Sequence, residues 1–346
     1  MSNYSERTPS SLELASGIGG MGLALRAAGF ASHGIDVNKK AVAVANSNGL
    51  HTTEMDLFDP DIVARLKDIN SSPDLIHGSF PCQGFSQASC ARDLHKQMCN
   101  SVTTRGVDTM IQMKPKVITL ENVLHARNSP TWQAAIARLN QHGYHTAQVQ
   151  LDACRLGVPQ SRRRLWVVGV RSNGDDLTAV LHLQAFISTC KERMREGEVT
   201  TIGEALPDMD GQTLFFFPRR RENQCVFASN RPAPTIRSMC LSPPSASLLE
   251  SESNAGPIAD AVRPTKELVL RLCGFPADFH LAPERVATAQ QLGNSVCPPM
   301  GRFVADFARS LISMAGDGST PGVQLVAKYA IPPVKFVTPR GVRADS

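Results

Sequence analysis

The sequence predicts an α/β protein with a doubly wound parallel sheet, followed by a smaller, irregular domain. In the first half, short apolar runs typical of buried strands alternate with longer segments that have helical periodicity. A glycine cluster at residues 17–22 separates the first such strand from the first helix. After about residue 172 this alternation is lost, and Pro, Arg, Ser and Asn become frequent.

The expected elements follow one another along the chain. We expect strands at residues 11–16, 31–36, 73–77, 116–120 and 165–170, and helices at 23–30, 39–48, 129–143, 265–275 and 302–315. Asn38 is a favourable N-cap for the second helix, because its side chain can accept hydrogen bonds from free backbone amides. Pro130 and Gly143 suit the two ends of the third helix. The last helix is amphipathic and is expected to pack back on the first domain.

Composition excludes several classes of protein. The 346 residues carry a net charge of +5, which is mild for this length and does not by itself indicate nucleic acid. Nine cysteines contain no C-x-x-C pair, so we expect reduced thiols and no metal site or disulfide framework. Because the N-terminus lacks a secretory signal and no eighteen-residue apolar run occurs, we expect a cytoplasmic protein with no membrane partner.

The glycine cluster has the spacing of a nucleoside-cofactor site. Residues 17–22 read Gly-Ile-Gly-Gly-Met-Gly, which fits G-x-G-x-x-G between a strand and a helix. Such a turn lets the backbone approach a ligand and presents amide groups at a helix start. Asp36 follows about twenty residues later, where an acid can hold ribose hydroxyls. The pattern alone suits a dinucleotide or S-adenosylmethionine, and it also occurs as a tight turn without a ligand.

Several polar side chains fall at the carboxyl ends of the expected strands. In doubly wound sheets ligands bind at this edge, and the glycine cluster, Asp36, Cys82 and Glu121 all reach it. Cys82 follows Pro81 just beyond a strand, so it is either a buried, unreactive thiol or a thiolate nucleophile. Glu121 is placed for acid or hydrogen-bonding chemistry, although a surface acid is the alternative.

A basic stretch precedes the last expected strand of the sheet. Because side chains alternate along an extended segment, Gln160, Arg162 and Arg164 are expected to point to the same side. Together they suit a polar ligand or phosphate groups. A solvated basic edge is the alternative.

The order of the motifs resembles the cytosine-C5 DNA methyltransferase family. The chain reads ELASGIGG, GSFPCQGFS, ENV, QSRRR, RPAPTI, GFPADF and GNSV in turn, and the resemblance covers residues 11–170 and 228–312. It implies a Rossmann-like catalytic and cofactor-binding domain at 1–172 and a target-recognition domain at 173–280. Residues 281–346 would then form a C-terminal segment that returns to the catalytic domain.

The resemblance implies methyl transfer from S-adenosylmethionine to C5 of a flipped cytosine, through a covalent bond between Cys82 and C6. The implied catalytic residues are Cys82, Glu121, Arg162 and Arg164. The implied cofactor contacts are Gly17, Ile18, Gly19, Gly20, Asp36, Asp56, Pro81, Asn294 and Ser295. The implied DNA contacts are Gln83, Ser86 and Gln160. Residues 83–105 would form a mobile loop that closes over the base.

The implied partner is double-stranded DNA. A restriction endonuclease can accompany such an enzyme in the cell, but no stable protein partner is expected. One departure from the family is Ala15, which stands where an aromatic residue usually precedes the glycine turn. Three alternatives stay open: a tRNA-methylating enzyme of the same family, a catalytically silent DNA-binding relative, and an NAD-dependent dehydrogenase. The ENV and QSRRR motifs would have no function in a dehydrogenase.

Overall fold

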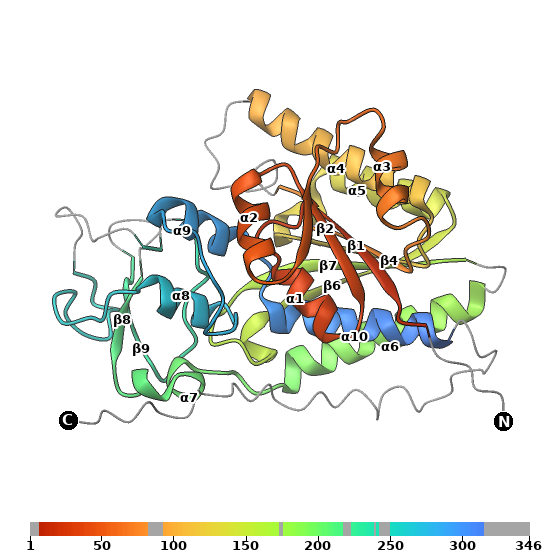
Figure 1. Cartoon of the computed structure of the whole chain (residues 1–346). Helices are drawn as coiled ribbons and strands as arrows, with labels where there is room; N and C mark the ends of the chain where they lie inside the picture. Colours follow the sequence, from red (N-terminus) through yellow and green to blue (C-terminus); the bar gives the residue numbers. More distant parts are fainter. Residues whose placement is uncertain are drawn as a thin grey trace.

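A seven-stranded mixed sheet forms the centre of the larger lobe, which is called the catalytic body here after the domain that the sequence predicted (Figure 1). The computed structural model describes residues 7–81, 93–172, 176–216, 223–238, 240–241 and 250–314. The strands are β1 (Ser10–Leu14), β2 (Ala31–Asp36), β3 (His51–Glu54), β4 (Leu75–Gly78), β5 (Val117–Asn122), β6 (Tyr144–Asp152) and β7 (Arg163–Arg171). Their order across the sheet is β3-β2-β1-β4-β5-β7-β6.

The sheet is parallel only in part. Strands β1 to β5 pair in parallel, whereas β7 runs antiparallel to both β5 and β6. The expectation of an α/β doubly wound sheet is confirmed, but its all-parallel form is wrong. A short helical turn, Ala153–Arg155, follows β6, and the chain then returns as β7 beside it. This reversal needs no crossover helix, which is why the two strands are antiparallel.

Helices cover both faces of the sheet (Figure 1). One face carries α1 (Gly20–Ala27), α6 (Asp176–Glu196) and α10 (Pro298–Met314). The other face carries α3 (Ile62–Ile69), α4 (Asp93–Met113) and α5 (Pro130–Gln141). Helix α2 (Lys39–Ser47) follows β2, and the Asn38 side chain accepts from the amides of Lys40 and Ala41, as the sequence predicted.

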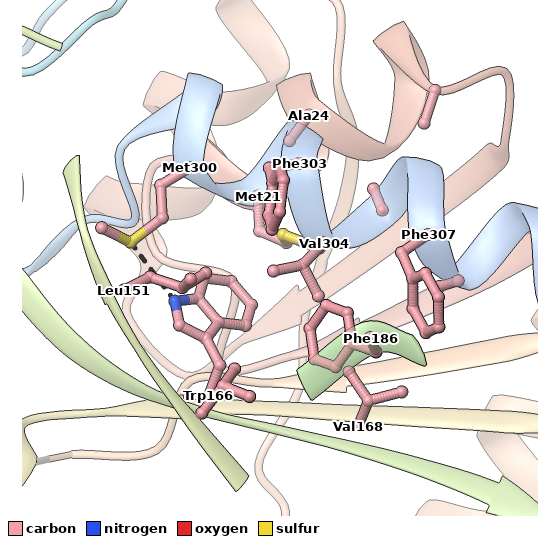
Figure 2. Packing of buried hydrophobic residues seen from close by; sticks show 14 of the residues in the cluster. Met21, Ala24, Leu151, Trp166, Val168, Phe186, Met300, Phe303, Val304 and Phe307 are labelled. Carbon is pink, nitrogen blue, oxygen red and sulfur yellow. Dashed lines mark hydrogen bonds between the residues drawn. The ribbon is translucent and has the colours of Figure 1, made fainter. Parts of the chain in front are cut away.

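The closing helix α10 packs on the catalytic body, as expected. Figure 2 shows its apolar side chains against those of α1, α6 and the sheet. Phe307 stacks on Phe186 of α6, with 4.4 Å between the ring centroids. The indole nitrogen of Trp166 donates to the sulfur of Met300 at 3.2 Å. The C-terminal part of the described chain is thereby tied to β7, close to the predicted arginines.

A smaller lobe lies beside the sheet (Figure 1). It contains α7 (Ile202–Ala205), β8 (Thr213–Phe215), β9 (Val226–Ala228), α8 (Lys266–Leu272) and α9 (Arg285–Asn294). Its apolar core also includes Ile18 and Ala41 from the catalytic body. Helix α6 packs against the sheet, although residue 173 was predicted as the start of the recognition domain. The small two-stranded sheet and long connections agree with the irregular domain that the sequence predicted.

Part of the predicted mobile loop is a helix. Residues 93–105 lie within α4, so the loop expected at 83–105 is wrong from Asp93 onward. Arg105 donates to the carbonyls of Leu57 and Asp59, which fixes this part of the helix against the loop after β3. Residues 83–92 lie outside the described residues. Strands β3 and β6 were missed, because β3 is only four residues long and both are rich in polar side chains.

Candidate active site

A cavity of about 330 Å³ opens at the carboxyl ends of the parallel strands. This is where open α/β sheets bind ligands, and the volume is within the range of small-molecule sites. Four groups of residues meet there: the turn after β1, the end of β2 with the start of α2, the ends of β4 and β5 with the start of β7, and the segment that ends α9. Most of the predicted cofactor and catalytic residues in the described chain line this cavity. Gly19, Gly20, Asp56 and Gln160 are not among its lining residues.

The turn after β1 is held to β2 by Asp36. The amide of Gly17 donates to one Asp36 carboxylate oxygen at 2.7 Å, and the amide of Asn38 donates to the other at 2.8 Å. Gly17 and Gly19 have φ angles of 57° and 89°, a region that glycine adopts without steric cost. Asp36 therefore orders the turn and still presents free lone pairs on the wall of the cavity.

The chain returns to the cavity at residues 287–296, the return segment, and its contact with Gly20 is very close. A Cβ atom on Gly20 would lie 2.2 Å from the Val296 carbonyl oxygen and 2.5 Å from the Ser295 hydroxyl. Only glycine permits this approach. Ile18, the one residue of the predicted turn 17–20 that is not glycine, lines the cavity and is buried in the core of the smaller lobe.

Ala15 lines the cavity in an uncommon backbone conformation. Its φ angle is 58°, which is unfavourable for a residue with a Cβ atom. No aromatic ring stands at this position, in agreement with the departure noted in the sequence. Asp56 accepts from the amide of Phe58 and does not line the cavity. Its predicted contact with adenine stays a prediction.

Glu121 and Arg164 form an ion pair on the cavity wall. Glu121 lies next to the last residue of β5 and Arg164 near the start of β7, and their side chains approach to 2.9 Å between Oε1 and Nε. Burial raises the pKa of Glu121 above its ordinary value, although the guanidinium groups of Arg164 and Arg162 act to lower it. A buried carboxyl with a raised pKa is suited to donating a proton or a hydrogen bond at neutral pH.

Arg162 holds the return segment in place. Its side chain is almost fully buried and donates to the carbonyls of Gly293, Ser295 and Ile236, at 2.9, 2.8 and 3.3 Å. Asn294 lies between the first two of these residues and is exposed on the cavity wall. Arg162 therefore shapes the wall that contains the predicted cofactor contacts.

Gln160 does not face a DNA-binding surface. Its side chain is fully buried, donates to the Leu272 carbonyl and the Cys273 sulfur, and accepts from the Ile236 amide. The predicted DNA contact by Gln160 is corrected to a structural role that joins the start of β7 to the smaller lobe. The residue turns to the same side as Arg162, as the alternation predicted, but that side is the protein interior.

The predicted nucleophile, Cys82, lies outside the described residues, as do Gln83 and Ser86. The chain is described up to Pro81, which lines the cavity. The Asn122 side chain donates to the Phe80 carbonyl at 3.1 Å and accepts from the Val123 amide. This interaction fixes the backbone two residues before Cys82.

Sequence reasoning missed several polar groups of the cavity. Glu13 in β1 is buried there, and burial raises its pKa well above the ordinary value, with a further increase from the Asp36 carboxylate. A charged residue between two leucines of a strand was the signal that could have found it. Two buried atoms, the Ser16 hydroxyl oxygen and Gln291 Oε1, have no hydrogen-bond partner among the described residues. Both residues line the cavity, which fits a polar ligand such as a nucleoside cofactor.

No group of three or more His, Cys, Asp or Glu side chains among the described residues could hold a metal ion. None of the described helices is long and apolar enough to cross a membrane.

The cavity combines a glycine turn with a buried carboxyl–guanidinium pair. Residues 10–308 match the C-5 cytosine-specific DNA methylase family. The chain belongs to this family. The resemblance drawn from the ordered motifs is thereby confirmed, and so is the expectation of a DNA cytosine-5 methyltransferase over a dehydrogenase.

Two curated relatives match most of this methylase. It is 32% identical over 299 residues to the Type II methyltransferase M.HgiDI of Herpetosiphon aurantiacus, covering 85% of this chain and 92% of the relative. It is 27% identical over 298 residues to the Type II methyltransferase M.HindV of Haemophilus influenzae, covering 85% and 94%. The match therefore extends over the sheet and the smaller lobe in both proteins.

Solved structures share the fold of this methylase. The Entamoeba histolytica methyltransferase EhMeth has a TM-score of 0.64 and 15% identity, covering 88% of this chain and 99% of that chain. The S. pombe Dnmt2 methyltransferase has a TM-score of 0.60 and 18% identity, with the same coverage. These likenesses confirm the Rossmann-like methyltransferase fold that was expected.

Proposed function

We propose that this methylase transfers the methyl group of S-adenosylmethionine to C5 of a flipped cytosine in duplex DNA, through a bond between Cys82 and C6. The observation that carries the proposal is the Glu121–Arg164 pair, which shares one cavity with the glycine turn. A cofactor held at the turn and a base held at the pair would face each other. Pro81 brings the chain to the same wall just before the nucleophile.

The chemistry requires a nucleophile and an acid on the same ring. C5 of cytosine is a weak nucleophile, and addition of the Cys82 thiolate at C6 makes C5 electron-rich. Glu121 in its protonated form would donate to N3 as charge develops there, which its raised pKa favours. S-adenosylmethionine, when bound, supplies an electrophilic methyl group. The C5 proton then leaves to a water molecule acting as base, the N3 proton returns to Glu121, and cleavage of the S–C6 bond restores the ring and releases the Cys82 thiolate.

Arg164 would hold Glu121 and contact the base oxygen. Its guanidinium group is largely buried and already oriented by the carboxylate, so little side-chain entropy is lost when a base binds. Arg162 would act on the other wall, because its donors are used by three carbonyls. The two arginines predicted as a pair therefore have different roles in this proposal.

The cofactor would lie between the glycine turn and the return segment. Gly17, Ile18, Gly19 and Gly20 would present backbone to it, and Asp36 would bind the ribose hydroxyls with its free lone pairs. Asn294 and Ser295 would close the pocket from the other side. Asp56 would reach the adenine amine only after releasing the Phe58 amide or turning its free oxygen inward.

DNA would lie between the sheet and the smaller lobe. The base must leave the helix to reach the cavity, because its ring is inaccessible inside a duplex. Gln83 and Ser86 would follow the nucleophile in the segment that closes over the base. The relatives named Type II methyltransferases suggest a role in a restriction–modification system, with a nuclease in the same cell rather than in a stable complex.

The direct test is transfer of label from S-adenosylmethionine carrying a tritiated methyl group to duplex DNA and, in parallel, to tRNA. We expect labelled DNA, and no label in the Cys82→Ala variant while cofactor binding persists. Label in tRNA alone would favour the RNA-methylating alternative. DNA containing 5-fluorocytosine should trap the protein covalently, since the fluorine blocks the final proton loss. A protein that neither binds the cofactor nor is trapped would be the silent DNA-binding relative.

A further inference from the structure

A buried histidine lies beneath the cavity, in the middle of the sheet. His77 in β4 is fully buried, and its register partners are Glu13 in β1 and Thr119 in β5. Its Nδ1 lies 2.9 Å from the Thr119 hydroxyl, and its Nε2 lies 2.6 Å from the Ser79 hydroxyl. The ring is 5.6 Å from that of Trp166, whose packing Figure 2 shows. The proposed chemistry does not use the side chains of this network, which are His77, Thr119, Ser79 and Trp166.

The imidazole of His77 is neutral over the physiological pH range. Burial lowers the pKa of His77 to about 3, so the ring carries one N–H group and one lone pair. The two hydrogen bonds must then run in the same direction through the ring. Either Ser79 donates to Nε2 and Nδ1–H donates to Thr119, or both bonds are reversed. In both cases the ring fixes the position of the Ser79 oxygen.

Ser79 is the member of this network that reaches the cavity. It follows β4, which lies between β1 and β5 in the sheet, and it lines the cavity wall. Its amide approaches the Leu14 carbonyl at the end of β1, directly before the glycine turn. On its other side, Glu121 lies next to the last residue of β5. Ser79 therefore lies between the region proposed for the cofactor and the pair proposed for the target base.

A methyl group that passes from a cofactor at the glycine turn to a base at the Glu121–Arg164 pair must cross the end of β4. We propose that the Ser79 hydroxyl oxygen contacts the sulfonium and its methyl group in S-adenosylmethionine, and that His77 is the positioning residue that orients it. The contact uses the first hydrogen-bond direction, with Ser79 donating to His77 Nε2. The lone pairs of the serine oxygen then face the positive charge and the polarised methyl hydrogens. This inference rests on the proposed function, because it needs the same cofactor.

The test compares two ligands that differ by the methyl group and its charge. Calorimetry of the full chain would measure the affinities of S-adenosylmethionine and S-adenosylhomocysteine. Ser79→Ala should weaken S-adenosylmethionine binding about fivefold, the value of one ordinary hydrogen bond, and change S-adenosylhomocysteine binding less than about twofold. His77→Leu should have the same selective effect. His77→Gln should keep much of the wild-type affinity for S-adenosylmethionine, since the glutamine amide oxygen can accept from Ser79.

Thr109→Val is the matched control. Thr109 is fully buried in α4, donates to the Arg105 carbonyl and does not line the cavity, so its loss should leave the affinity ratio unchanged. Equal weakening of both ligands by Ser79→Ala, or no weakening, would overturn the inference. If the His77 variants do not fold, ¹⁵N NMR of the wild type shows which nitrogen of His77 carries the proton. A proton on Nε2 would contradict the inference. A wild type that binds neither ligand would overturn the proposed function as well. If the wild type binds both ligands and Ser79→Ala leaves the ratio of the two affinities unchanged, only the role of Ser79 is removed.

Discussion

The two walls of the cavity are built in different ways. The sheet wall consists of the ends of β1, β4 and β5, where strand register sets the position of each side chain. The return wall is the segment 287–296, which lies more than a hundred residues further along the chain. It is held by two hydrogen bonds from Arg162, to the carbonyls of Gly293 and Ser295, and by the close contact with Gly20. The first wall depends on the paired strands of the sheet, and the second on the packing of α9 and on side-chain contacts at its end.

This difference predicts where the site is vulnerable. A substitution on the sheet wall changes one functional group, because the surrounding ladder hydrogen bonds keep the backbone in place. A substitution at the anchors of the return wall can displace the end of α9 and residues 295–296, because Arg162 and Gly20 contact the backbone there directly. We therefore expect the largest effects on stability from residues that touch no ligand.

Arg162→Met should be the most destabilising of the changes considered. It removes a buried guanidinium group and leaves the carbonyls of Gly293, Ser295 and Ile236 without their donor. We expect a loss of about 3 kcal/mol in the free energy of unfolding, since orphaned buried acceptors are costly. Urea denaturation measures this value, and binding of S-adenosylmethionine should weaken in parallel.

Arg163→Met is the matched control for Arg162→Met. The side chain of Arg163 is exposed and lines a different cavity, beside Arg127 and Lys191. We expect a change within about 0.5 kcal/mol, as for most surface positions. Similar losses in the two variants would mean that the return wall does not depend on Arg162.

Gly20→Ala should displace the return wall by steric contact. The added Cβ would meet the Val296 carbonyl oxygen at 2.2 Å, and a backbone atom cannot move away independently. We expect a loss of about 1–3 kcal/mol in unfolding free energy, typical of overpacking, together with weaker cofactor binding.

Gly17→Ala separates this steric effect from backbone strain. Gly17 has a φ angle of 57°, but its Cβ would meet no atom within 4 Å. We expect only the strain of a left-handed alanine, about 1 kcal/mol, when unfolding is measured without ligand. A Gly17 variant as unstable as the Gly20 variant would show that the turn, and not the contact with Val296, sets the effect.

The sequence predicted the sheet wall better than the return wall. The glycine spacing, Asp36 and Glu121 could be placed at one edge because parallel strands end together. The anchoring role of Arg162 could not be predicted, because it depends on carbonyls of a segment far away in the chain. Gln160 was misassigned for the same reason, since alternation shows which side a residue takes but not what lies there. His77 escaped notice because a single buried histidine has no motif.

The smallest effect we predict concerns the pH dependence of the sheet wall. Only protonated Glu121 can donate to the base, so the rate of methyl transfer should fall as the pH rises through the pKa of Glu121. Burial raises this pKa and Arg164 opposes the increase. Arg164→Met removes the opposing charge, so the pKa rises further and the alkaline decline should move to higher pH. Arg164→Lys keeps the charge and should leave the decline near that of the wild type.

Single-turnover methylation over a range of pH measures this shift, since it isolates the chemical step from product release. The sign follows from linkage. A carboxyl whose pKa is raised by folding binds more protons in the folded state, so its contribution to stability decreases as the pH rises above the unfolded pKa. The unfolding free energy of Glu121→Gln should therefore depend less on pH than that of the wild type. An alkaline decline that stays unchanged in both Glu121→Gln and Arg164→Met would belong to another group, and the sheet wall would then lack its proposed acid.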